Sequence, residues 1–141
     1  MGVTMKSRNY CIDFSYSGFN MLRLTCAELT SPEVFEHYKN LFSGLQAPYR
    51  ETFLNDYNAK TEALKKKNDA KISDIFDFLH ASDDDTEMDA KHCESIYEVI
   101  KDYDDGILYG YGGRKDCTKF ADFKNVVKDG IDSGTGFTLS F

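Results

Sequence analysis

The sequence predicts an α+β fold in which a small antiparallel sheet is packed by about five helices. Three observations support this prediction. An alternating apolar pattern near the N-terminus is typical of a β-hairpin, stretches with apolar residues at helical spacing follow it, and a second alternating pattern closes the chain. A chain of 141 residues is long enough for one domain with a substantial core, so we treat residues 1–141 as a single domain.

The N-terminal alternation runs from Asn9 to Glu28. Its apolar face begins with Tyr10, Ile12, Phe14 and Tyr16 and continues with Phe19 and Met21. Ser17-Gly18 breaks the alternation, and we interpret the whole stretch as a β-hairpin. At the other end of the chain, Phe137, Leu139 and Phe141 alternate in the same way. They predict a closing strand that lies against the hairpin.

Five helices are expected between these two patterns. The first begins at Ser31-Pro32-Glu33, where a cap residue precedes a proline and an acid. The next ones begin at Pro48, at Lys71, at Ala90 after the cap residue Asp89, and after the cap residue Thr118. The Lys71 helix is expected to end at His80 and the Ala90 helix at about Tyr103. The last helix is expected to bury Phe120, Phe123, Val126, Val127 and Ile131.

The acidic stretch between two of these helices carries the most chemistry. It begins with His80-Ala-Ser-Asp-Asp-Asp-Thr-Glu-Met-Asp89 and reaches Cys93 one turn into the next helix. Imidazole, carboxylate and thiolate are the groups that bind Zn²⁺, usually four in a tetrahedron. We therefore predict a zinc site whose ligands are His80, Asp83, Asp85 and Cys93. His92, Glu87 and Cys117 are further candidate ligands.

Two alternatives remain open for this stretch. Calcium is the alternative ion, because Asp83, Asp85, Glu87, Asp89 and Glu94 fall at positions 1, 3, 5, 7 and 12 of an EF-hand loop. Met88, however, stands where that loop needs glycine. The second alternative is a solvated acidic loop that binds nothing and caps the following helix through Asp89.

The same stretch also resembles a known family. Phe78-Leu-His-Ala-Ser-Asp83 through Cys93, then a helix with Phe123 and an alternating C-terminal strand, is similar to small uncharacterised bacterial proteins. Their hallmark is a His-x-Ser-Asp-Cys-Asp-Gly-Glu loop followed by a cysteine. The matching residues are His80, Ser82, Asp83, Asp85, Glu87 and Cys93, whereas Asp84 replaces the loop cysteine and Thr86 the glycine. The resemblance covers about the second half of the chain and implies metal binding, with zinc ahead of calcium.

The expected function is binding rather than catalysis. The chain contains no HExxH, HxE…CxxC or GxSxG pattern, so we expect no enzyme. There are two alternatives: a metal-dependent hydrolase that uses residues 80–93, and a housekeeping domain without metal. The formal net charge of −7 argues against nucleic acid or an anionic membrane as partner. It fits either a solvated acidic surface or a surface complementary to the groove of a basic protein partner. An interaction surface is expected at Asp102, Asp104, Asp105 and Asp116, with Tyr109 and Tyr111 either as its aromatic anchors or as core residues.

Small acidic proteins without catalytic motifs are frequent in bacterial phages and mobile elements. There they often inhibit host defence. We therefore expect a zinc-binding inhibitor of the anti-CRISPR type, whose carboxylates replace phosphates in the basic channel of a CRISPR effector nuclease. Residues 1–8 are short and polar, the four cysteines form no CxxC pair, and no apolar run is as long as a membrane span. These features predict a cytoplasmic protein with free thiols.

Overall fold

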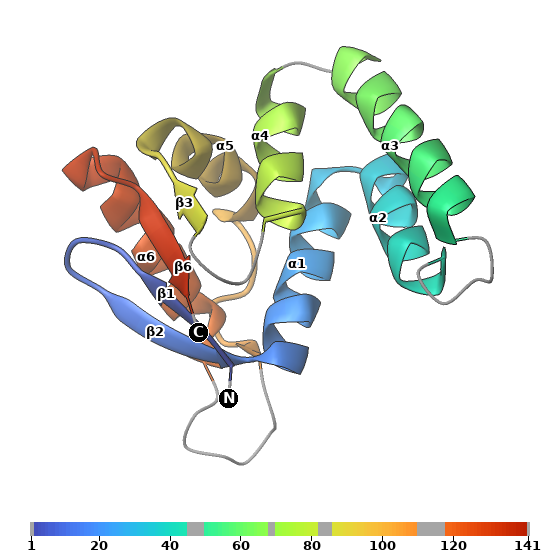
Figure 1. Cartoon of the computed structure of the whole chain (residues 1–141). Coiled ribbons are helices and arrows are strands. Elements are labelled where there is room, and N and C mark those ends of the chain that lie inside the picture. The colour runs from blue at the N-terminus through green and yellow to red at the C-terminus, as the bar shows by residue number, and fades with distance from the viewer. Residues whose placement is uncertain (1, 45–49, 68–69, 82–85, 110–117, 141) are drawn as a thin grey trace.

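The computed structural model describes residues 2–44, 50–67, 70–81, 86–109 and 118–140 (Figure 1). Its helices are α1 (Tyr16–Thr30), α2 (Pro32–Gly44), α3 (Arg50–Lys67), α4 (Ala70–Leu79), α5 (Ala90–Ile100) and α6 (Phe120–Ser133). Its strands are β1 (Gly2–Lys6), β2 (Cys11–Ser15), β3 (Thr86–Met88), β4 (Leu108–Tyr109), β5 (Thr118–Lys119) and β6 (Phe137–Ser140). The predicted α+β class is confirmed, with strands near both ends of the chain.

The main sheet has the strand order β2-β1-β6-β3, and every neighbouring pair is antiparallel. The predicted pairing of the C-terminal strand with the N-terminal hairpin is therefore confirmed. Its register aligns Met5 with Leu139 and Met88 with Phe137, so apolar side chains from three strands share one buried face. On the opposite face, the Thr4 hydroxyl donates to the Asp13 carboxylate at an exposed position. A second, two-stranded sheet joins β4 to β5.

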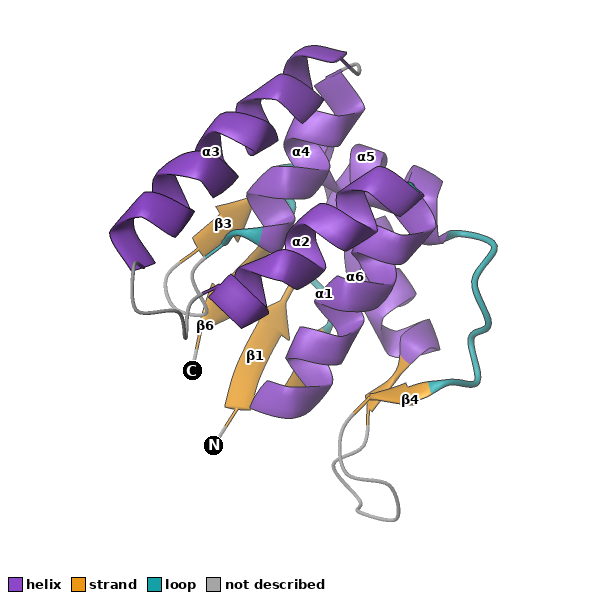
Figure 2. Cartoon of the chain, turned by 90° about the vertical axis from the view of Figure 1, so that its right-hand side faces the viewer, coloured by secondary structure: helices purple, strands orange, loops and turns teal. Residues whose placement is uncertain are grey.

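The helices gather on the apolar side of the main sheet, and α1, α5 and α6 contact its strands. Helix α4 packs between α1 and α5 (Figure 1). Helices α2 and α3 form a pair on the side of α1 and α4 that faces away from the sheet (Figures 1 and 2). The sheet residues and the helices therefore enclose one core, and α2 and α3 extend it outward.

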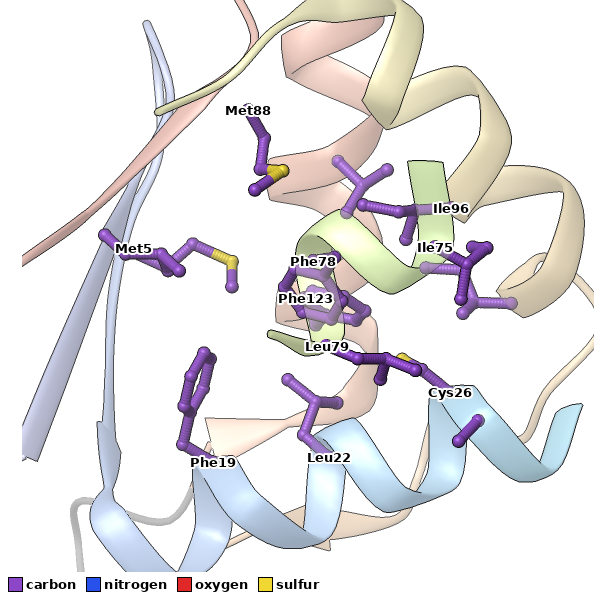
Figure 3. Close-up of a cluster of buried hydrophobic side chains, with 14 of the residues drawn as sticks. Met5, Phe19, Leu22, Cys26, Ile75, Phe78, Leu79, Met88, Ile96 and Phe123 are labelled. Atoms are coloured by element: carbon purple, nitrogen blue, oxygen red, sulfur yellow. The ribbon is translucent and has the colours of Figure 1, made fainter. Parts of the chain in front are cut away.

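The core is rich in aromatic rings. Figure 3 shows Met5 and Met88 pointing from the strands towards Phe78 of α4, Phe123 of α6 and Phe19 of α1. Phe78 stacks on Phe123 with ring centroids 5.9 Å apart, and it meets Phe137 of β6 edge-on at 6.1 Å. Such pairs add to the large area that each ring buries. Helix α4 thus supplies the centre of the core. The few polar residues in this helix therefore call for an explanation.

The N-terminal prediction was only partly right. The hairpin exists but joins Gly2–Lys6 to Cys11–Ser15, and residues 16–28, which we expected to complete it, lie in helix α1 instead. The Ser15 side chain accepts a hydrogen bond from the Gly18 backbone N–H and caps this helix. Its buried residues are Gly18, Phe19, Leu22, Arg23, Cys26 and Ala27, which is a spacing of three and four rather than two. With α1, the described residues form six helices, where we expected about five.

Two other boundaries differ from the prediction. Thr86–Met88 forms strand β3 rather than loop, because its backbone pairs with β6. Thr118 belongs to β5, and Lys119 is the N-cap of α6. Asp89 caps α5 as predicted, and its side chain accepts from the His92 backbone N–H. The predicted inward residues of α6 are buried, apart from Ile131, which is half-buried.

Among the described residues, no helix combines the length and the apolar character needed to cross a membrane.

Candidate metal centre

Helices α4 and α5 pack against each other and bring two acids and a histidine together. Asp74 and Asp77 are three residues apart on α4, so their side chains project on the same side of the helix. His92 stands in the first turn of α5. Its Nε2 lies 2.8 Å from Asp77 Oδ2 and 3.5 Å from Asp74 Oδ1. These three donor atoms all lie within 4.8 Å of one another.

The other ring nitrogen of His92 is held by Asp89. His92 Nδ1 lies 2.7 Å from Asp89 Oδ1, and the same oxygen accepts the His92 backbone N–H at 2.9 Å. A carboxylate at this position favours a proton on Nδ1. Metal-binding histidines in proteins almost always donate their second ring N–H in this way, which orients the ring. When His92 is protonated, Nε2–H donates to Asp77; when Nε2 carries no proton, its lone pair points towards the carboxylates of Asp74 and Asp77.

Asp74 is positioned by a second contact. The Ser95 hydroxyl donates to Asp74 Oδ2 at 2.6 Å, which leaves Oδ1 directed at His92. The side chain of Asp74 is 10% exposed, that of His92 is 23% exposed and that of Asp77 is 46% exposed. The cluster therefore runs from the helix interface to the surface, and a dissolved ion can reach it.

The electrostatics of the cluster favour a cation. Burial disfavours the charged imidazolium, but the hydrogen bonds to Asp77 and Asp89 and the charge of Asp74 outweigh it and raise the pKa of His92. The His92 backbone N–H and then its ring hold the pKa of Asp89 below its ordinary value. Three carboxylates around one ring leave an excess of negative charge even when His92 is protonated.

The spacing suits a small divalent ion. In a tetrahedral zinc site with bonds of about 2.1 Å, neighbouring donor atoms lie about 3.4 Å apart. The distances of 2.8 and 3.5 Å from His92 Nε2 bracket this value, so small side-chain rotations reach it. Among the residues that the structure describes, no other group of three or more histidine, cysteine or acidic side chains meets in this way.

His80, the first predicted ligand, directly follows α4 and its ring turns towards α2 and α3. Its Nε2 is 2.8 Å from the Tyr57 hydroxyl, and its ring stacks on Phe76 and contacts Tyr38. Although the residue is partly exposed, the desolvation of its ring, with a smaller contribution from His37, lowers the pKa of His80 to about 4. His80 is therefore a neutral ring in an aromatic cluster between α2, α3 and α4.

Cys93, the last predicted ligand, is fully buried between α5 and α6. A Cβ placed on Gly130 of α6 would lie 2.8 Å from its sulfur, so the thiol fills the contact between the two helices. Burial, together with the charges of Asp89 and Glu94, raises the pKa of the Cys93 thiol to about 12. A metal ligand needs the thiolate, and this environment disfavours it.

The other predicted ligands divide into two groups. Asp83, Asp85 and Cys117 lie outside the described residues, as do Asp116 and Tyr111 of the predicted interaction surface. Glu87 is exposed on β3, where it pairs with Thr138. The site of His80, Asp83, Asp85 and Cys93 therefore stays a prediction, and so does the calcium alternative. His92, which we considered as an additional ligand, is the one that the structure joins to other donors.

Sequence reasoning missed Asp74 and Asp77. Helix α4 is otherwise strongly apolar, with Ile72, Ile75, Phe76, Phe78 and Leu79 buried. Two acids three residues apart in such a helix form a narrow polar stripe, and this stripe is the signal that could have been found. Which helix the stripe faces, however, depends on tertiary packing.

No protein-family model, curated protein or solved structure matches the chain. The resemblance to the bacterial family and the anti-CRISPR function stay predictions.

Proposed function

We propose that this protein binds a divalent metal ion through Asp74, Asp77 and His92, and that the ion fastens α4 to α5. The observation that carries the proposal is the orientation of His92. With Nδ1 held by Asp89, Nε2 faces two carboxylates, and it offers them a proton when His92 is charged or a lone pair to a cation when it is neutral. Three acceptors that converge in this way repel one another unless a proton or a cation lies between them. A divalent ion offsets more of this negative charge than a proton does.

Zinc is the ion that we propose. Imidazole favours Zn²⁺ over Ca²⁺ or Mg²⁺, and Zn²⁺ also accepts carboxylate oxygens as ligands. Calcium takes six to eight oxygen ligands, whereas among the described residues this cluster offers the carboxylates of Asp74 and Asp77 besides the ring. The site differs from the one predicted from sequence, but the class of ion is the same.

We propose a structural role for the ion rather than hydrolysis. Three protein ligands leave room for a water molecule, as in catalytic zinc sites. A hydrolase would also need a general base beside that water. Asp89 is the remaining carboxylate of the cluster, and its Oδ1 already accepts two hydrogen bonds from His92. An ion at the interface of two core helices adds its binding free energy to the stability of the fold.

The experiment is a zinc titration by calorimetry on protein first treated with chelator. The variants are Asp77→Asn and His92→Gln, each of which removes one ligand while keeping a polar side chain. His80→Gln is the matched control, since the His80 ring contacts Tyr57 of α3 and Tyr38 of α2. We expect one ion per chain in wild type and His80→Gln, and a loss of about 100-fold or more in affinity in the two ligand variants.

Melting temperatures measured with zinc and with chelator complete the test. Zinc should raise the melting temperature of wild type and His80→Gln but not that of the ligand variants. If wild type binds no zinc, the cluster is an ion-pair network around protonated His92. If His80→Gln loses zinc while His92→Gln retains it, the site predicted from sequence is the correct one.

A cytoplasmic location is part of the same proposal. Cys11, Cys26 and Cys93 are free thiols. A reducing compartment preserves such thiols.

A further inference from the structure

An open pocket lies between the first half of α1 and the segment that leads into β4. It measures about 450 Å³. Met21 and Thr25 line it from α1, and Tyr103, Ile107, Leu108 and Tyr109 line it from the other side. Figure 2 shows β4 beside the lower end of α1. This pocket is on a different part of the molecule from the candidate metal centre on α4 and α5.

The floor of the pocket is built from ordered aromatic residues. Tyr109 is 5% exposed, and its hydroxyl donates to Thr25 Oγ1 at 3.2 Å. Its ring packs on Phe120 with centroids 5.7 Å apart, and Tyr103 meets the same ring edge-on at 4.7 Å. The floor is therefore part of the folded core.

The walls of the pocket are apolar and open to solvent. Met21 is 56% exposed and Leu108 is 48% exposed. Among the described residues they are the two most exposed of the four exposed large apolar side chains, and both line this pocket. Exposed apolar residues that gather at one concavity, above a rigid aromatic floor, are typical of a protein-binding surface.

Exposed acids stand next to the lining residues in the chain. Glu28 follows Met21 and Thr25 on the same side of α1, at intervals of seven and three residues. Asp102 and Asp104 precede the wall on the other side. All three acids are exposed, and none forms an ion pair with another described residue, whereas the neighbouring Asp105 binds Lys124 at 2.6 Å. These exposed acids are therefore close in sequence to lining residues on both sides of the pocket.

We infer that this pocket binds a basic segment of a partner protein, with one apolar side chain seated between Met21 and Leu108 and Lys or Arg residues against Glu28, Asp102 and Asp104. The acids Glu28, Asp102 and Asp104 are complementary in charge to the Lys or Arg residues of such a segment. A second copy of the chain is disfavoured, because two identical sets of these acids would face each other across the interface. A nucleic acid would meet the same repulsion.

The test uses a synthetic peptide of leucine and lysine, patterned as an amphipathic helix, and a matched peptide with glutamate in place of lysine. Binding is measured by fluorescence anisotropy in chelator, so that the result is independent of the metal proposal. We expect the lysine peptide to bind wild type, and Met21→Ser and Leu108→Ser to weaken it about tenfold. Tyr10→Ser is the matched control and should bind like wild type, because Tyr10 is 44% exposed in the β1–β2 turn.

The charge contribution is tested with a Glu28→Gln, Asp102→Asn, Asp104→Asn variant. It should bind the lysine peptide more weakly and with a smaller dependence on salt. Asparagine at position 104 can still accept the Gly106 backbone N–H, which Asp104 Oδ1 accepts at 2.8 Å, so the local turn is kept. Equal binding of both peptides, or lysine-peptide binding unaffected by Met21→Ser and Leu108→Ser, would overturn the inference. A dimer in sedimentation experiments that Leu108→Ser dissociates would overturn it as well.

Discussion

Asp89 Oδ1 accepts two hydrogen bonds from His92, one from the backbone N–H at 2.9 Å and one from ring Nδ1 at 2.7 Å. One carboxylate oxygen thus begins helix α5 and also sets the direction of the His92 ring. The cap is a local feature, whereas the ring direction matters only because Asp74 and Asp77 of α4 stand opposite. This relationship connects the start of a helix to the candidate metal centre.

The two tasks of Asp89 can be separated by substitution. Asp89→Ala removes both the cap and the ring contact, and should lower the free energy of unfolding by about 1 kcal/mol. Asp89→Asn keeps a good cap and should cost clearly less. Urea denaturation of both variants in chelator makes the comparison. Equal losses would mean that the cap contributes little and that the charge of Asp89 is what matters.

The stability of the metal-free protein should depend on the protonation of His92. Because its folded pKa is raised, the stabilisation is fully present below the unfolded pKa of about 6.5 and is lost as the pH rises through the folded pKa. The stability difference between wild type and His92→Gln should therefore shrink with rising pH. Urea denaturation in chelator across this range measures it.

Histidine titrations by NMR supply an internal control. Burial and the charge of Lys60 lower the pKa of His37, so His37 should titrate below His92. A pKa for His92 at or below that of a free histidine would contradict the geometry of its carboxylates.

Ser95 should support zinc binding without touching the ion. Its hydroxyl holds Asp74 Oδ2 at 2.6 Å, so Ser95→Ala frees the carboxylate to rotate. Loss of such a supporting contact typically weakens a metal about 10–100-fold. Calorimetric titration with zinc measures the affinity. Ser73→Ala, a change on α4 outside the cluster, is the control. If Ser73→Ala weakens zinc binding as much as Ser95→Ala does, Ser95 does not orient Asp74 specifically.

Two glycines after α6 give a prediction about the fold. Gly134 and Gly136 both have positive φ, at 73° and 71°. A Cβ on Gly134 meets nothing within 4 Å, so Gly134→Ala should cost about 1–2 kcal/mol from backbone strain alone. A Cβ on Gly136 would lie 1.8 Å from the Met88 carbonyl oxygen, where β3 and β6 meet. Gly136→Ala should therefore destabilise the protein far more than Gly134→Ala. Thermal unfolding measures the difference. Similar melting temperatures for the two variants would contradict the close approach of Gly136 to the Met88 carbonyl.

The sequence alone determined the fold class, the closing strand, five of the six helices and the Asp89 cap. These features are encoded by neighbours in the chain, through apolar periodicity and capping chemistry. Helix α1 was missed because Tyr10, Ile12, Phe14 and Tyr16 alternate and the pattern was extended past Ser15. The cap at Ser15 and the spacing of Phe19, Leu22 and Cys26 were the competing signal.

Only the tertiary structure decided where the chemistry lies. His80 and His92 are both near the acidic stretch in sequence, but the packing of α4 turns His80 towards Tyr57, while α5 places His92 opposite Asp74 and Asp77. Cys93 likewise has the chemistry of a ligand, but the close approach of α6 at Gly130 buries it. A sequence names the groups that can bind an ion, but the direction of each side chain depends on how the helices pack, because that packing is made by residues far apart in the chain.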